Sequence, residues 1–220
     1  MRPRIVQFII AVSFLGANVV AQGKAAPCPL FATSLQKAGQ DFEIASQYIG
    51  LVRDALATFP GEAELLGEMA TISRCVSWLI DPKEPHLRVA SSIISRENSN
   101  LRIYAFVGSC PGSEPGVAMV IALNGPFYNP STTVGPYRGG TALARGLIIL
   151  HELCHNLATS CIDDLDDPQL ADENNRFLVR NFRKTLEEVV RLSGRHRTGG
   201  PAIHGVRSGD YVKAANLVSN

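Results

Sequence analysis

Apolar residues recur three or four positions apart in several long segments of the chain, and this spacing predicts helices that each bury one face. Two such segments, 42–59 and 62–80, are separated by Pro60-Gly61, which ends the first helix. They are predicted to form an N-terminal helical hairpin. A later segment, 170–192, follows an acidic stretch and is predicted to be one amphipathic helix.

Short runs rich in valine, isoleucine and other apolar residues predict strands at 87–94, 101–107 and 116–123. The polar residues 97–100 are typical of a turn between the first two runs. Residues 124–140 are rich in Gly, Pro and aromatic residues and are predicted to be mostly loop. Helices and strands in this order indicate an α+β fold with a small, mostly antiparallel sheet.

The segment 141–160 is apolar nearly all round, which indicates a buried helix rather than a helix on the surface. Gly139-Gly140 precedes this segment as a break in the chain, and Thr141 is a suitable N-cap. The segment nevertheless contains the run His151-Glu152-Leu153-Cys154-His155. Buried polar side chains need partners, and a metal ion would satisfy both histidines at once.

The H-E-x-x-H pattern of this run is the strongest chemical signal in the chain. Residues four apart on a helix share a face, so the rings of His151 and His155 can point at one metal ion. Glu152 can then reach a water bound to that metal and act as the general base of a zinc hydrolase. A pair of buried core histidines is the alternative interpretation of the same pattern.

A catalytic zinc takes a third protein ligand and leaves one position open for water. Among the carboxylates after His155, Asp163 and Asp164 can reach back from the turn that follows the helix. Glu173, near the start of the next helix, is a further alternative and would give a gluzincin-like site. The other aspartates of the acidic stretch are expected to be solvated or to cap the next helix.

Two further roles call for residues from elsewhere in the chain. A second donor to the oxyanion is expected, and the residues considered for it are Tyr128, Tyr137 and His204. The strand at 116–123 is either an edge that pairs with an extended peptide substrate or an ordinary buried strand.

The N-terminus has the features of a secretory signal peptide, because a short basic start is followed by an apolar stretch and small residues that permit cleavage after Ala21. An uncleaved membrane anchor is the alternative. Residues 22–192 are then predicted to be one peptidase domain and 193–220 a loosely ordered tail. This organisation predicts a secreted or periplasmic protein.

The net charge and the cysteine content bear on the partners of the protein and on its disulfide bonds. The formal net charge is +1, so nothing indicates nucleic-acid binding. The protein is predicted to be a monomer that acts on a peptide or protein substrate and has no stable membrane association once the signal is removed. Five cysteines in an exported chain predict disulfide bonds with one thiol left over, and Cys154 is predicted to be that free, packed thiol.

Three local features resemble the deuterolysin-like zinc endopeptidases, the aspzincins, which include lysine-specific secreted enzymes. One is the strand with its Phe-Tyr segment at 120–128, and another is the metal helix at 147–155. The last is the run Ala171-Asp172-Glu173-Asn174-Asn175-Arg176-Phe177. In that family an aspartate shortly after the second histidine binds zinc, and Asp164 stands at the corresponding position.

The resemblance covers roughly residues 100–185 and implies a zincin-like fold with His151, His155 and Asp164 as the zinc ligands. The family's aspartate lies in a Gly-Thr-x-Asp-x-x-Tyr-Gly segment, whereas the matching stretch here lacks the Gly and Thr and has Asp167 in place of the tyrosine. The tyrosine that serves the family as a transition-state donor therefore has no counterpart in this chain.

Together these observations predict a secreted zinc metalloendopeptidase that hydrolyses peptide bonds with a Zn²⁺-bound water activated by Glu152. One alternative is a gluzincin-like hydrolase, with Glu173 as third ligand, that acts on a non-protein or cell-wall peptide substrate. The other is a catalytically inactive secreted binding module. Zn²⁺ is the predicted cofactor.

Overall fold

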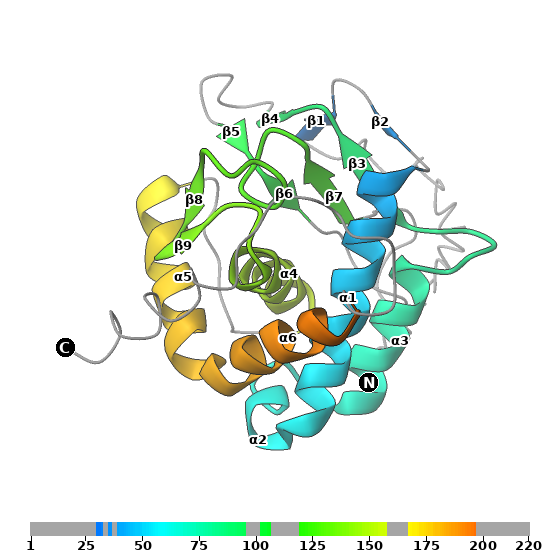
Figure 1. Cartoon of the computed structure of the whole chain (residues 1–220), viewed down its shortest axis with the longest axis vertical. Helices are drawn as coiled ribbons and strands as arrows, with labels where there is room; N and C mark the ends of the chain where they lie inside the picture. The colour runs from blue at the N-terminus through cyan, green and yellow to red at the C-terminus, as the bar shows by residue number, and fades with distance from the viewer. Residues whose placement is uncertain are drawn as a thin grey trace, which may run out of the picture.

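The structure is a computed structural model that describes residues 30–32, 35–36, 39–95, 102–106, 119–157 and 167–196. Several predicted features lie outside these ranges: the signal segment 1–21, Asp163, Asp164, His204 and the chain after residue 196. Within them the chain is α+β, as predicted, with helices packed beside small sheets (Figure 1). None of the described helices combines the length and the apolar character needed to cross a membrane.

The N-terminal helices differ from the predicted hairpin in one respect. The first helix, α1, spans Gln40–Thr58 and agrees with the prediction, but the second segment divides into α2 (Pro60–Ala63) and α3 (Met69–Leu79). Gly67 lies between the two parts with φ of 129°, a conformation that favours glycine. A Cβ at Gly67 would lie 3.7 Å from the carbonyl oxygen of Leu157, so the chain bends here to pass the end of another helix.

Short strands form two main sheets and a small ribbon. The first sheet has the order β1-β4-β5, from Leu30–Ala32, Ile93–Ser95 and Arg102–Ile103. The second has the order β2-β3-β7-β6, from Leu35–Gln36, Leu87–Ala90, Met119–Ala122 and Ala105–Phe106. The ribbon pairs β8 (Thr133–Val134) with β9 (Tyr137–Arg138), inside a segment predicted to be mostly loop.

The predicted strands at 87–94 and 101–107 each divide between the two sheets. They pair with each other only at β4 and β5, where Ile93 lies opposite Ile103. Further along, β7 separates them, because it pairs parallel to β3 and antiparallel to β6. Every other strand pair in the described chain is antiparallel, so the predicted character of the sheet is confirmed.

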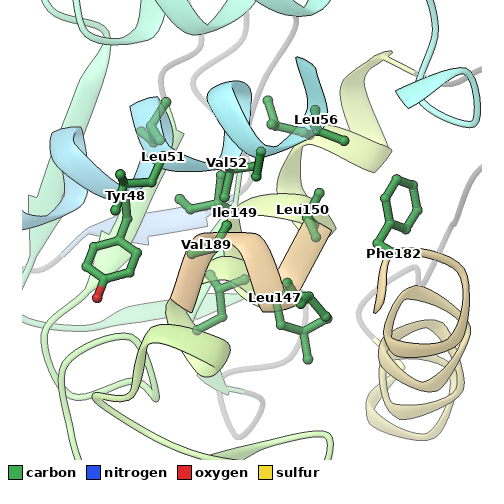
Figure 2. Packing of buried hydrophobic residues seen from close by; sticks show 14 of the residues in the cluster. Tyr48, Leu51, Val52, Leu56, Leu147, Ile149, Leu150, Phe182 and Val189 are labelled. Atoms are coloured by element: carbon green, nitrogen blue, oxygen red, sulfur yellow. The ribbon is translucent and has the colours of Figure 1, made fainter. Parts of the chain in front are cut away.

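A buried helix occupies the centre of the described fold. This helix, α4, spans Ala142–Leu157 and falls within the predicted segment 141–160. Figure 1 shows α4 nearly end-on, with strands on one side and α1, α5 and α6 around the others. Its apolar side chains Leu147, Ile149 and Leu150 pack among residues of α1 and α6 such as Val52 and Val189 (Figure 2). Burial on several sides explains why this segment is apolar nearly all round.

The predicted helix 170–192 is two helices, α5 (Pro168–Asn181) and α6 (Arg183–His196). The break is at Phe182, a fully buried residue with φ of −116° and ψ of 29°. Beyond it, the backbone N–H groups of Lys184 and Thr185 donate to the carboxylate of Glu62. Glu62 of α2 therefore caps the N-terminus of α6. Helix α6 also continues to His196, past residue 193, where the tail was predicted to begin.

Candidate functional site

The start of α4 is fixed by local chemistry that the sequence predicted. The hydroxyl of Thr141 accepts a hydrogen bond from the backbone N–H of Ala144 at 3.2 Å, as an N-cap does. Gly140 has φ of 74°, and a Cβ at Gly139 would lie 2.1 Å from the carbonyl oxygen of Asn129. Only glycine fits this close approach, so the Gly-Gly pair allows the chain to turn immediately before the helix begins.

Two histidines and a glutamate lie together in the C-terminal half of α4. The ring centroids of His151 and His155 are 4.8 Å apart, with an angle of 68° between the ring planes. His151 is 9% exposed, Glu152 is 5% exposed, and His155 is half-buried. The helical spacing thus places both imidazoles on one face and leaves one side of the pair closer to solvent.

The donor set fits a zinc ion. Two nitrogen ligands of a tetrahedral zinc lie roughly 3.3 Å apart when each is at a normal Zn–N distance, and their ring centres lie somewhat farther apart. The 4.8 Å between the centroids of His151 and His155 agrees with that geometry. Imidazole is also a nitrogen ligand that zinc prefers. The described part of the chain can therefore supply two of the three protein ligands of a catalytic site.

The described residues do not supply the predicted third ligand. Asp164 and Asp163 lie outside the described ranges, and within those ranges no group of three or more His, Cys, Asp or Glu residues is placed to hold a metal ion. Glu173 is described and exposed, so the structure does not bring it to the histidine pair. The reason is its place on α5, where it points roughly 200° around the helix from Asn175, which contacts α4.

Asn175 is a residue of the site that the sequence analysis did not single out. Its side-chain oxygen lies 3.0 Å from Nδ1 of His151. The helix that carries it begins at an N-cap, Asp167, whose carboxylate accepts from the backbone N–H of Gln169 at 2.8 Å. The available signal was a polar residue within an apolar stripe, because Asn175 shares one helical face with the buried residues Leu178 and Phe182.

The two tyrosines considered as oxyanion donors have other neighbours. The hydroxyl of Tyr128 donates to the backbone carbonyl of Asp41 at 2.5 Å, and burial raises the pKa of this tyrosine. Burial, and then the charge of Glu187 on α6, raise the pKa of Tyr137. The backbone of Tyr128 also lies beside Gly140, and His151 is roughly 14 Å farther along the helix axis from its start. The structure therefore assigns Tyr128 to the opposite end of α4.

The strand β7 is not an edge. Its residues pair with β3 on one side and with β6 on the other, and all of them are buried. The interpretation of 116–123 as a strand that an extended substrate joins is therefore wrong for the described residues 119–122, whose backbone groups are already used by the sheet. In the described order the sheet ends at β2 and β6.

The state of Cys154 also differs from its prediction. The residue is fully buried on α4, as expected, but both Cys75 and Cys154 are disulfide-bonded rather than free. The prediction assumed that a thiol packed inside a helix bundle stays unreacted. Burial does not prevent a bond when another cysteine is packed against the same place.

Comparison with known proteins does not identify a family. No family model, no curated protein and no solved structure matches this chain. The resemblance to aspzincins therefore rests on local motifs of the sequence alone.

Proposed function

We propose that the protein is a secreted zinc metalloendopeptidase with a zincin-like fold, related in its site to the aspzincins. The observation that carries this proposal is the pair of imidazoles of His151 and His155, whose ring centroids are 4.8 Å apart in an edge-to-face arrangement, beside the buried residue Glu152. His151 and His155 would hold Zn²⁺, and the resemblance to the family adds Asp164 as the third ligand. The predicted signal peptide would direct this activity outside the cell.

A bound Zn²⁺ would lower the pKa of a water ligand and polarise the carbonyl group of the scissile peptide bond. The residues of the chain then have two tasks. The histidines orient the site, because both belong to α4, a helix whose apolar side chains are packed in the core. Glu152 moves the proton: its carboxylate takes a proton from the attacking water and passes it to the nitrogen of the leaving amine.

The position of Glu152 suits this task. It is 5% exposed, so its carboxylate exchanges few contacts with bulk water. The rigid helix also fixes its distance from the histidines, which come directly before it and three residues after it. A general base must lie within hydrogen-bond reach of the proton that it removes, and the helical spacing of Glu152 from both histidines supports this role.

Replacing Glu152 by Gln tests the proposal, because Gln keeps the size of the side chain and cannot accept the proton. We expect Glu152→Gln to keep zinc bound and to lower turnover by about 10²–10⁴-fold. Purified wild type and variant would digest an unfolded protein, with the fragments identified by mass spectrometry. Glu173→Gln is the matched control, since Glu173 is an exposed glutamate on α5, and it should retain wild-type activity.

The outcomes separate the possible functions. Cleavage by wild type and by Glu173→Gln, but not by Glu152→Gln, would establish the endopeptidase and reveal its side-chain preference. Equal cleavage by all three proteins would remove Glu152 from the mechanism. No cleavage by any of them, with zinc bound, would favour a narrower peptide substrate or a binding role.

A further inference from the structure

We propose that Asn175 is a positioning residue that selects which nitrogen of His151 faces the metal. This inference rests on the proposed function, because it concerns the same zinc site. It starts from one contact: Oδ1 of Asn175 lies 3.0 Å from Nδ1 of His151, across the interface between α5 and α4.

The chemistry of the two side chains sets the direction of this hydrogen bond. A carboxamide oxygen has no proton to give, so Nδ1 of His151 donates and carries the proton of the neutral ring. The lone pair of the ring then lies on Nε2. A metal binds the nitrogen that carries the lone pair, and a partner on the other nitrogen fixes both the tautomer and the orientation of the ring. Asn175 is therefore placed to present Nε2 as the ligand atom.

Asn175 lies beside a tight turn. Gly135, between β8 and β9, has φ of 50°, and a Cβ at this position would lie 3.6 Å from Cβ of Asn175 and 3.5 Å from Cδ2 of Leu147. The turn thus rests against α5 and α4 at once. The Cβ of Asn175 therefore lies beside this turn, at the place where α5 contacts α4.

The choice of an amide also has a consequence for charge. His151 is 9% exposed, and a carboxylate beside it would add a negative charge to a poorly solvated site. Asn175 accepts the same hydrogen bond without that charge. An aspartate at this position should therefore keep the orienting contact, whereas a leucine of similar size should lose it.

The neighbouring residue provides a matched control. Asn174 is on the same helix, and its side-chain Nδ2 is buried with no hydrogen-bond partner among the described residues. Removing a buried donor that makes no bond is neutral or slightly stabilising. Asn174→Leu therefore repeats the chemical change of Asn175→Leu one position away, without removing a contact to His151.

The test measures the zinc dissociation constant of the full chain by competition with a chromophoric chelator. We expect Asn175→Leu and Asn175→Ala to raise this constant by about 10–100-fold, the usual effect of losing the orienting partner of a histidine ligand. Asn175→Asp should bind zinc as tightly as wild type or more tightly, and Asn174→Leu should not differ from wild type. Having two truncated variants keeps the test decisive if one of them does not fold.

A second readout reports the tautomer directly. In the metal-free protein, nitrogen NMR of the His151 ring should show the Nδ1-protonated form in wild type, Asn174→Leu and Asn175→Asp, and a mixture of tautomers in Asn175→Leu. Equal zinc affinity and an unchanged tautomer in the truncated variants would overturn the role of Asn175 alone, as would equal losses in Asn174→Leu. A wild-type protein that binds no zinc would overturn the proposed function, and this inference with it.

Discussion

Tyr128 joins two parts of the chain that lie far apart in the sequence. Its hydroxyl donates to the backbone carbonyl of Asp41, at the start of α1, while its backbone lies beside Gly140 at the start of α4. Tyr128→Phe removes the hydroxyl donor, so the backbone carbonyl of Asp41 loses this hydrogen bond. We expect the free energy of unfolding to fall by about 1 kcal/mol in a urea titration. Zinc affinity and turnover should stay unchanged, and a large loss of turnover would return Tyr128 to the list of oxyanion donors.

The same residue gives this prediction a pH dependence. Burial raises the pKa of Tyr128 above its ordinary value of 10.0, so the folded state keeps the proton that the unfolded state loses above that pH. The stability that this proton confers is fully present below pH 10.0 and is lost as the pH rises beyond it. Wild type should therefore lose stability more steeply than Tyr128→Phe above that pH, by at most about 1.4 kcal/mol per pH unit. Parallel curves would contradict this assignment.

Single residues of the site differ in how far the sequence could predict them. His151, Glu152 and His155 are neighbours along one helix, so their spacing was enough to predict that they meet. Asn175, which contacts His151, is 24 residues away from it, and the apolar stripe that contains Asn175 indicates an inward face without indicating that this face meets α4. The bonded state of Cys154 likewise depends on which other cysteine packs against it, which is a property of the folded chain.

At the scale of elements, Glu62 explains why one predicted helix is two. Its carboxylate accepts from the backbone N–H groups of Lys184 and Thr185, which have no partner in the first turn of α6. We expect Glu62→Ala to lower the free energy of unfolding by about 0.5–2 kcal/mol, the usual loss of a cap. Glu64→Ala is the control, because Glu64 is exposed and should change stability by less than about 0.5 kcal/mol. Equal effects in urea titrations would contradict the capping role.

The elements that were predicted well are those with local signals. Thr141 and the Gly-Gly break define the start of α4, and Pro60 ends α1. Where the prediction was wrong, the deciding contact is remote in sequence. The cap at α6 comes from a residue more than a hundred positions earlier, and the strands at 87–94 and 101–107 divide because β7 pairs between them. The spacing of apolar residues shows which face of a helix or strand is buried, but it does not show which other elements pack against that face.

At the scale of the whole molecule, the apolar core is built without the histidine pair. The main cluster of buried apolar residues joins α1, α3, α4 and α6 and includes large side chains such as Phe182, Leu147 and Ile49. None of these contacts needs a metal. In a small zinc domain, metal binding supplies most of the folding free energy. The proposed zinc site lies on a large apolar core, so folding should depend much less on the metal.

We therefore expect removal of zinc with a chelator to abolish turnover while the protein stays folded. Near-ultraviolet circular dichroism should keep its native signal, because the packed core is intact. Adding back zinc at about 100 times its dissociation constant should stabilise the fold by about 2.7 kcal/mol, which would raise Tm by roughly 5–11 °C for a domain of this size. In His155→Ala this rise should be largely lost, since one imidazole cannot replace two. If the chelator instead unfolds the wild-type protein, the fold depends on the metal, and the apolar core is not sufficient to hold the chain folded.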